Sequence, residues 1–426
     1  MPGSAEVPAP DRPGGRRPAG TPFHRPTRAM RRDLAQAVCA VAGLVLGLLL
    51  PLISVGPKIE AGRVVTLMFT IGFGVVSLVT IIYSMLFLVV QFSASTFTPR
   101  LLLFRDDPIV WRTFAFVVGV FIFSVTAGLS MGKRSVVSVA VPAVTMLSAL
   151  VALAFMRTLQ TRAFSAIQLA PALDVISGRG HRLLDALYPG PYAPAPDSGA
   201  PVARPASDGA APIDVRWPGK AAVLQQIDVP GLIAAAGRHD CLVTLEAPIG
   251  SLLTRGTLLA RIHGQGMRPD DVFGAVRTGL ERTFDQDPGL PLRLLTDITL
   301  RALSPAVNDP ATAVQALDHT EDLLTRLAGR DLAIGAFGDA GGTARLIVHA
   351  PTWEQYVRLA VDEVMVAAAR SPMTLLRLRA LLTRLLTACP PPRRSVVGSR
   401  LEWIEAAGST GFPLHWSGPP AEGPPV

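Results

Sequence analysis

The chain has 426 residues, of which 49% are hydrophobic and 17% charged, and its formal net charge is +8 at pH 7. The hydrophobic share is too large for an ordinary soluble protein and is concentrated before residue 157, whereas the remainder has the length of one or two soluble domains. The three cysteines lack the spacing of a zinc site or a disulfide framework, so neither is expected, and no cofactor is predicted.

The first 33 residues form a basic tail that abuts the first apolar stretch. Because this charge stands next to a membrane span, its expected partner is anionic lipid and not nucleic acid. The apolar run continues into a full-length span without a small-residue cleavage site, which predicts an uncleaved first helix. The arginines of the tail are Arg12, Arg16, Arg17, Arg25, Arg28, Arg31 and Arg32.

Four long stretches contain no charged residue, and each is long enough to cross a hydrocarbon layer of about 30 Å as a helix. They are Leu34 to Pro57, Val64 to Pro99, Thr113 to Gly132 and Ser135 to Met156. The second stretch is too long to lie wholly in hydrocarbon, so its helix is predicted to project into the cytoplasm and to end at Pro99.

The distribution of lysine and arginine sets the expected topology. The basic tail dominates, so both termini and the soluble region are predicted in the cytoplasm of a multi-pass protein of the cytoplasmic (inner) membrane. The loops from Val55 to Arg63 and from Ser130 to Arg134 are then outside. Unpaired cysteines fit a cytoplasmic location for the soluble part.

The predicted fold class is an α-helical membrane protein, in which four transmembrane helices precede a mostly helical cytoplasmic α+β region with a small β module. The expected segments are a basic disordered tail (1–33), the four-helix transmembrane domain (34–156), a helical extension (157–188), a Pro/Ala/Gly linker (189–212), a small αβ module (213–266), a helical cytoplasmic domain (267–408) and a disordered tail (409–426).

Within the soluble part, residue alternation and helical spacing predict the individual elements. The predicted strands are Ala222 to Ile227, Cys241 to Leu245, Leu258 to Ile262 and a lone strand at Leu346 to His349. The predicted helices are a continuation of the fourth span to Ala170, short helices at His181 to Leu187 and Gly231 to Gly237, and then Asp270 to Thr283, Leu292 to Leu303, Pro310 to Leu327, Trp353 to Ala369, Met373 to Ala388 and Val396 to Ala407.

The segment from Val243 to Ile262 looks like half of a lipoyl-like β module, with glycines at its turns. It contains no lysine that could carry lipoate or biotin, so a structural role is expected.

The second span carries small or polar residues at helical spacing. They are Thr66, Thr70, Gly74, Ser77, Ser84 and Gln91. One interpretation is tight helix packing, and the other is a wet pathway. The uncharged stretches lack the ionisable groups usual in ion-coupled transporters, but a channel lined by hydroxyls stays open. Gly43 and Gly47 form a GxxxG pattern that weakly suggests dimerisation.

In the soluble part, Asn308, Asp309 and Pro310 predict a helix start after a tight turn, with a ligand site at the turn as the alternative. The acidic run around Asp318 and Glu321 is interpreted as a solvated helix face rather than a metal site. No catalytic motif is present, and no residue is assigned to catalysis.

Two segments carry a resemblance to a known family: QFSASTFTPRLL (from Gln91) and RTFDQDPGLPLRLLTDITLRALSPAVNDPATAVQALDHTEDLL (from Arg282). They resemble the signatures of a widespread bacterial family of predicted membrane proteins, domain of unknown function 2254. IDVPGLIAAAGRHDCLVTL resembles its middle segment. The resemblance implies the architecture and no activity. Its motif positions, of unknown role, are Pro99, Arg100, Asp287, Pro288, Arg301, Ser304, Pro305, Asn308, Asp309 and Pro310.

The leading hypothesis is a homo-oligomeric, channel-like or regulatory membrane protein for the passage of small solutes or ions. The alternatives are a membrane-anchored ligand-binding module or enzyme that uses the cytoplasmic domain, and a scaffold for envelope proteins.

Overall fold

The computed structural model describes residues 28–53, 56–96, 108–132, 134–193, 211–332 and 336–416. The chain divides into two compact units. Unit 1 comprises Met1–Tyr83 and Asp107–Leu159, and unit 2 comprises Ser84–Asp106 and Gln160–Val426.

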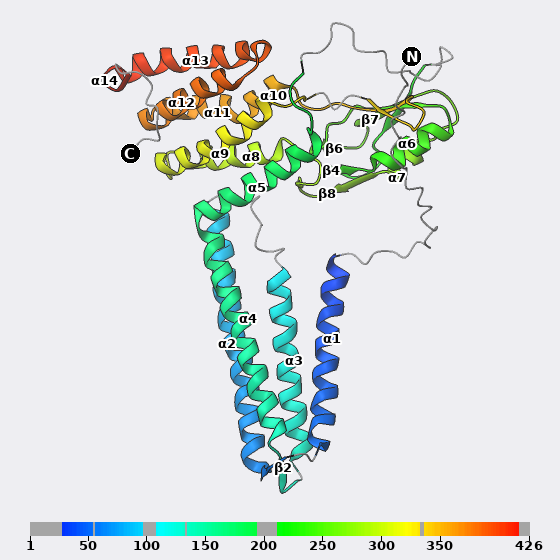
Figure 1. The fold of residues 1–426 in the computed structure, drawn as a ribbon, viewed down its shortest axis with the longest axis vertical. Helices are drawn as coiled ribbons and strands as arrows, with labels where there is room; N and C mark the ends of the chain where they lie inside the picture. Colours follow the sequence, from blue (N-terminus) through cyan, green and yellow to red (C-terminus); the bar gives the residue numbers. More distant parts are fainter. Residues whose placement is uncertain are drawn as a thin grey trace, which may run out of the picture. The chain divides into compact units, whose positions relative to one another are not determined.

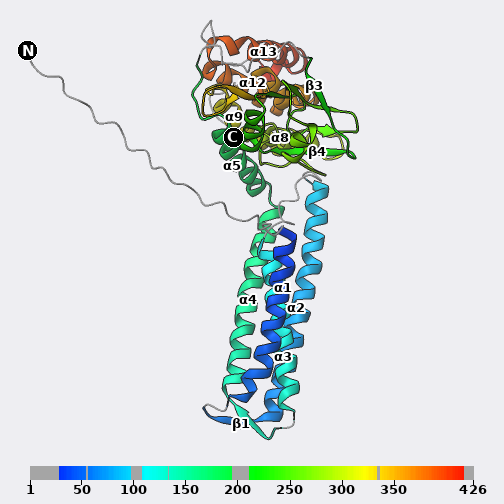
Figure 2. The same ribbon diagram turned by 90° about the vertical axis from the view of Figure 1, so that its right-hand side faces the viewer.

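Unit 1 is built from long apolar helices that run alongside one another (Figures 1 and 2). They are α1 (Arg28–Leu49, followed by the 3-10 turn η1, Leu50–Leu52), α2 (Ala61–Thr96), α3 (Pro108–Met131) and α4 (Ala140–Ile167), of which α2 and α4 continue into unit 2. The candidate spans are Leu34–Leu52, Ala61–Ser84, Ile109–Met131 and Ala140–Arg162. The four predicted spans are therefore helices of sufficient length and hydropathy to cross a membrane. The predicted helix end at Pro99 lies outside the described residues.

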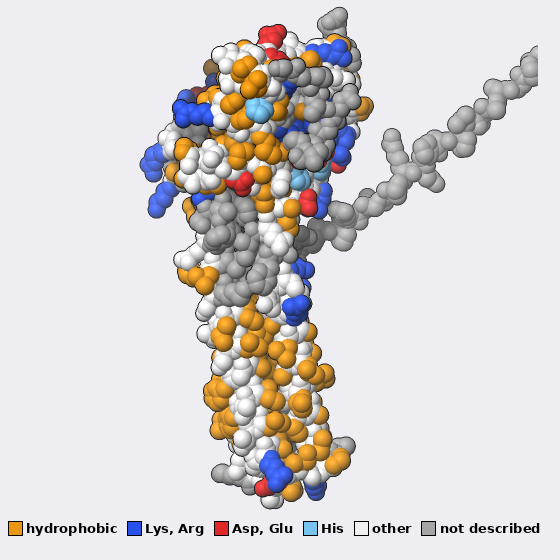
Figure 3. All heavy atoms as spheres, turned by 90° about the vertical axis from the view of Figure 1, so that its left-hand side faces the viewer, with side chains coloured by type: hydrophobic (Ala, Val, Ile, Leu, Met, Phe, Trp, Pro, Cys, Tyr) orange, Lys and Arg blue, Asp and Glu red, His pale blue; other side chains and the backbone are white. Residues whose placement is uncertain are grey.

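The surface of these helices agrees with a lipid environment. Figure 3 shows one face of unit 1 covered by hydrophobic side chains, with lysine and arginine side chains towards the ends of the helices. Large apolar residues such as Leu147, Leu150 and Ile81 are more than half exposed, which a water-soluble bundle would avoid. A hydrocarbon layer around the helices removes this cost.

Helices α1 and α3 approach each other closely at glycines. A Cβ atom at Gly43 would collide with the carbonyl oxygen of Gly119, and one at Gly119 would lie 2.8 Å from the carbonyl oxygen of Cys39. At Gly47 a Cβ atom would meet the Thr126 side chain at 2.8 Å. The GxxxG pattern is thus used for packing inside one chain, since small residues let the two backbones meet.

The connections after α1 and after α3 pair with each other. Strand β1 (Lys58–Glu60) runs antiparallel to β2 (Val136–Ser138), with Ile59 opposite Val137. Both connections therefore lie at the same end of unit 1, as an alternating path of four membrane crossings requires.

The helical part of unit 2 has a single large apolar core. Its elements are α5 (Leu169–Leu187), α8 (Leu290–Ala302), α9 (Pro310–Ala328), α10 (Trp353–Val357), a π-helical turn η2 (Arg358–Asp362), α11 (Glu363–Ala368), α12 (Pro372–Ala388), α13 (Pro391–Gly411) and α14 (Pro413–Trp416). Residues 409–416, expected in the disordered tail, are helical in part, and Trp416 packs on Gly408 in this core.

The helix expected to continue to Ala170 ends instead at Ile167, and α5 begins at Leu169 rather than at His181. Pro171 explains the break, because it lacks an N–H group and its ring would clash with the carbonyl of Ile167 in a continuous helix. The linker expected from residue 189 is fastened at its start, where the Tyr192 N–H group donates to the Gly329 carbonyl at 2.8 Å.

The β part of unit 2 contains two sheets, of strand order β3-β7-β5-β10-β9 and β6-β4-β8. The strands are β3 (Ile213–Arg216), β4 (Ala222–Ile227), β5 (Leu242–Leu245), β6 (Leu252–Leu253), β7 (Leu258–His263), β8 (Val276–Gly279), β9 (Ala336–Gly338) and β10 (Ala344–Val348), with the helices α6 (Val229–Arg238) and α7 (Pro269–Gly274). Figure 1 shows them apart from the helical group of unit 2.

Two predictions for this part were wrong. The helix expected from Asp270 to Thr283 stops at Gly274, because the following residues form β8 and pair with β4. The strand expected to be alone is β10, which lies between β5 and β9 and pairs in parallel with β5, Leu346 opposite Val243. The β module thus recruits strands from beyond residue 266. Its core is separate from the helical core.

Candidate functional site

The polar stripe of α2 faces outward from unit 1. All six of its members, Thr66, Thr70, Gly74, Ser77, Ser84 and Gln91, are exposed. The Thr70 hydroxyl donates to the Thr66 carbonyl at 2.8 Å, and a Cβ atom at Gly74 would meet nothing within 4 Å. The buried side of α2 is instead apolar, with Val64, Met68 and Val75. Among the described residues, the members of the stripe therefore take exposed positions of α2 and not its buried ones.

The motif positions near residue 308 form the turn between α8 and α9, with Arg301 in α8 and Pro310 first in α9. The Asp309 carboxylate accepts hydrogen bonds from the Thr312 N–H group at 3.1 Å and from the Thr312 hydroxyl at 2.6 Å. These bonds lower the pKa of Asp309, because they favour its charged form. Asn308 adopts φ +48°, and the Ser304 hydroxyl bonds the Arg301 carbonyl. Pro305 is exposed. Pro99 and Arg100 lie outside the described residues.

The acidic run on α9 is occupied by ion pairs. Glu321 pairs with Arg377 and Arg384, and Asp318 also contacts Arg377. These arginines lower the pKa of Glu321 even though burial opposes the charged form. Among the residues that the structure describes, no group of His, Cys, Asp or Glu is arranged to hold a metal ion.

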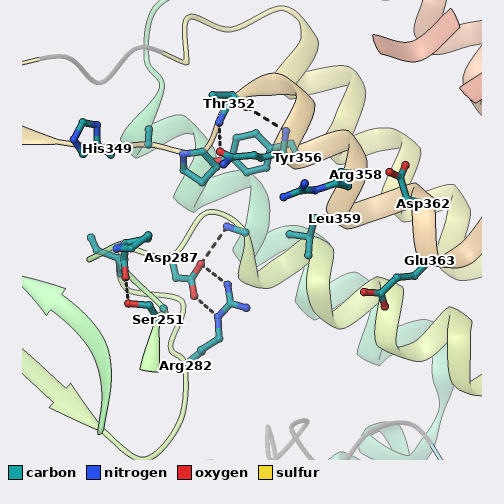
Figure 4. A pocket seen from close by; sticks show the side chains of 17 residues that line it. Ser251, Arg282, Asp287, His349, Thr352, Tyr356, Arg358, Leu359, Asp362 and Glu363 are labelled. Atoms are coloured by element: carbon teal, nitrogen blue, oxygen red, sulfur yellow. Dashed lines mark hydrogen bonds and ion pairs between the residues drawn. The ribbon is translucent and has the colours of Figure 1, made fainter. Parts of the chain in front are cut away.

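Asp287 and Pro288 lead to a larger feature, which we call the junction cleft. It has a volume of about 900 Å³ and lies where the chain passes from β8 to α8 and from β10 to α10, between the two cores of unit 2 (Figure 4). Four segments line it, at residues 248–251, 282–289, 349–352 and 355–363. Clefts between packed cores are common sites for small molecules.

One wall of the junction cleft is fixed by a buried carboxylate. Asp287 is 2% exposed, and it accepts two hydrogen bonds from Arg282, at 2.5 and 2.8 Å, and one from the Gly289 N–H group at 3.2 Å. Gly250 adopts φ +89° beside it, and a Cβ atom there would collide with the carboxylate. Two-point pairing and a glycine neighbour together hold the loop before α8 in one geometry.

A second wall includes Tyr356, whose buried phenol is bonded to that of Tyr188 outside the lining. The hydroxyls of Tyr188 and Tyr356 lie 2.7 Å apart, and each residue is 1% exposed. Burial raises the pKa of Tyr188 to about 12 and that of Tyr356 well above its ordinary value. The hydrogen bond between the two phenols joins the end of α5 to α10.

The third wall is the π-helical turn η2. Arg358, Leu359, Asp362 and Glu363 all line the junction cleft. In a regular α-helix, residues five apart such as Arg358 and Glu363 would point about 140° apart. The wider π-helical turn brings them to one face, and such turns occur frequently at functional sites. The Thr296 hydroxyl satisfies the Leu359 carbonyl at 3.1 Å.

A small apolar annex opens beside the junction cleft, with a volume of about 90 Å³. The two share the wall residues Pro248, Ile249, His349, Ala350 and Pro351. The annex is further lined by Leu187, Ile227, Val229, Gln286, Pro288, Phe337 and Val348. One side of the space is thus polar and the other apolar.

Several long apolar helices with a lipid-type surface, joined to a folded α+β part that contains a cleft, define the class of membrane proteins. The sequence profile of the family described as "Predicted membrane protein (DUF2254)" matches residues 34–384, and the chain belongs to this family.

Two mycobacterial proteins similar to this chain are also described as uncharacterized. The chain is 30% identical over 341 residues to the uncharacterized protein Rv1290c of Mycobacterium tuberculosis, and the same identity holds for the uncharacterized protein Mb1321c of Mycobacterium bovis. The match covers 75% of this chain and 63% of each relative, so the chain spans less than two thirds of their length. No solved structure matches the chain.

Sequence reasoning found Asp287 and Pro288 only as family motif positions, and it placed His349 only at the end of a predicted strand. Arg282 entered only as the first residue of a segment that resembles the family, and other lining residues, Thr352, Tyr356 and Arg358 among them, were not singled out. A signal was present in the run Gln286-Asp287-Pro288-Gly289, where an acidic residue directly precedes a buried apolar helix and therefore needs a partner.

Proposed function

We propose that this chain is a membrane protein whose soluble part binds a small solute in the junction cleft and thereby regulates a process at the membrane. The observation that carries the proposal is the cleft itself, with walls at Asp287, at Tyr356 and at the π-helical turn. Pre-formed walls favour binding, because little conformational entropy is lost when a ligand enters.

A thermal-shift experiment on the full chain in lipid nanodiscs tests this function. The probes are a set of small carboxylates, phosphates, amines and neutral amides. At least one should raise the melting temperature of the wild type, because a ligand of the native state stabilises it. The same probe should act less on His349→Trp, which fills the cleft, than on His415→Trp, an exposed histidine outside it. No shift with any probe, or equal shifts in both variants, would refute the function.

We further propose that unit 2 and both termini lie in the cytoplasm of a cell with this protein in its cytoplasmic membrane. The arginine-rich tail supports this orientation, as do Arg157 and Arg162 after the fourth apolar stretch, because cationic residues are retained inside. The tail arginines would bind anionic lipid there. Cys241 and Cys389 are free thiols, as the cytoplasm allows.

A second candidate function is a homo-oligomeric conduit. It is favoured by one observation, the outward position of the polar stripe on α2, which would meet the same stripe of neighbouring copies. In a Cys39→Ala background, Ser77→Cys should then react with a small hydrophilic thiol reagent in membranes, whereas the adjacent, lipid-facing Leu78→Cys should not. An unreactive cysteine at 77, together with liposomes that pass no ions or solutes, would exclude the conduit.

A further inference from the structure

One arginine that lines the junction cleft, Arg358, has a side chain without a partner among the described residues. Asp287 pairs with Arg282, and the other two acidic side chains of the lining also contact arginines. Asp362 pairs with Arg400 at 2.6 Å, and Glu363 pairs at 3.1 Å with Arg293, which also pairs with Asp297 at 2.8 Å. The side chain of Arg358 makes no ion pair or hydrogen bond with any part of the chain that the structure describes. With Asp297 included, these four arginines and four carboxylates balance, and Arg358 is the arginine of the lining whose guanidinium stays available to a ligand.

The position of Arg358 on the π-helical turn directs its guanidinium group into the junction cleft. Arg358 begins the π-helical turn, and Figure 4 shows its side chain extending from that turn into the space beside Tyr356 and Leu359. The neighbouring carboxylates of Asp362 and Glu363 pair with Arg400 and Arg293 and not with Arg358. An arginine so placed presents its donors to an incoming oxyanion.

We propose that the junction cleft binds a small organic anion, a carboxylate or a phosphate monoester, whose charged group pairs with Arg358 and whose short apolar group enters the annex. This proposal rests on the solute-binding function proposed above and specifies its ligand class. The annex, at about 90 Å³, accepts a short chain but not the acyl chain of a membrane lipid. A water-soluble metabolite is therefore the source, rather than the bilayer.

The experiment measures the binding of defined probes to the full chain in nanodiscs by calorimetry. Hexanoate and butyl phosphate are the anionic probes, hexanamide is the neutral match of hexanoate, acetate lacks the apolar chain, and dodecanoate has a chain too long for the annex. Hexanoate or butyl phosphate should bind at least roughly tenfold tighter than hexanamide, because a charge-assisted bond to arginine is lost in the amide. Acetate and dodecanoate should both bind more weakly than hexanoate.

Three variants locate the two contacts. Arg358→Gln should weaken hexanoate binding roughly tenfold or more while it leaves hexanamide binding unchanged. Arg370→Gln removes an exposed arginine outside the cleft and should change neither. Val229→Phe fills the annex and should weaken hexanoate but not acetate. The melting temperature of each variant checks that it is folded.

Each contrary outcome is distinct. Equal affinity of hexanoate and hexanamide, or an unchanged affinity in Arg358→Gln, overturns the assignment of an anionic ligand. Tighter binding of dodecanoate overturns the short-chain assignment and points to lipid. If only amines or neutral amides stabilise the protein in the thermal-shift experiment, the solute-binding function stands and the anion proposal fails. If no probe does, both fail.

Discussion

Two carboxylates in unit 2 each fix a turn before a helix through a few hydrogen bonds. Asp309 caps α9 through two bonds to Thr312, and Asp287 ties the loop before α8 to Arg282. In both cases a carboxylate satisfies donors that the fold would otherwise leave unpaired. The unfolding free energy that is lost when such a carboxylate is replaced depends on its charge state. The contribution of the side chain can therefore be tested by varying the pH.

The helix cap at Asp309 should make stability depend on pH. Asp309→Ala should lower the unfolding free energy of the full chain by about 1 kcal/mol at pH 7. The folded pKa of Asp309 lies below its ordinary value of 3.8, so the stabilisation that depends on its charge is present above that value and is lost as the pH falls through the folded pKa. Thermal unfolding should therefore show a difference between wild type and variant that narrows below about pH 4. Asp309→Asn, which keeps the cap without the charge, should be less destabilised at pH 7, and an equal loss in both variants would contradict the cap.

Gly250 and Gly256 allow the contact with Asp287 to be separated from backbone strain. Both have positive φ, +89° and +87°, but a Cβ atom at Gly256 would meet nothing within 4 Å, whereas one at Gly250 would collide with Asp287. Gly256→Ala should cost about 1–2 kcal/mol through φ alone. Gly250→Ala should cost more and should also lower solute binding, because the Arg282–Asp287 pair must move. Equal melting temperatures for the two variants would show that the Arg282–Asp287 pair can move at little cost in stability.

Among the helices, the closest approach is that of α1 to α3. Gly43→Leu should separate these helices and lower the stability of the protein in detergent by about 1–3 kcal/mol, because a bulky side chain would be forced into an occupied space. Gly74→Leu is the matched control on α2, where the glycine faces open space. Its melting temperature should equal that of the wild type. Size-exclusion chromatography with light scattering then adds a second result: a smaller assembly in Gly74→Leu would support self-association through the stripe, and an unaltered one would not.

For the molecule as a whole, orientation in the membrane decides which compartment would supply the proposed solute. Cys241 and Cys389 are poor reporters of it, since they are 0% and 2% exposed and burial raises the pKa of Cys389 to about 11. Lys58, in the connection after α1, and Ser395, in α13, are exposed. The variants Lys58→Cys and Ser395→Cys are therefore better reporters. A membrane-impermeant thiol reagent on intact cells should label position 58 and spare position 395 until the membrane is opened. The reverse pattern would place unit 2 outside.

Much of the architecture follows from local sequence. Uncharged runs of sufficient length define the four spans, since burying a charge in hydrocarbon costs too much. Asp309 followed by Pro310 marks the start of α9, and alternation marks β4 and β7, because capping and side-chain periodicity are local properties of the chain.

Contacts between distant segments could not be predicted in this way. The strand at Val276–Gly279 takes its conformation from pairing with β4, which overrides a helical pattern, and β10 joins a sheet whose other strands lie far away in sequence. The junction cleft likewise depends on segments from residue 248 to residue 363, on a π-helical turn that no local pattern announces, and on which arginines find partners. Arg358 differs from the paired arginines only by what surrounds it, because burial and charge pairing are properties of packing in three dimensions and not of the residue.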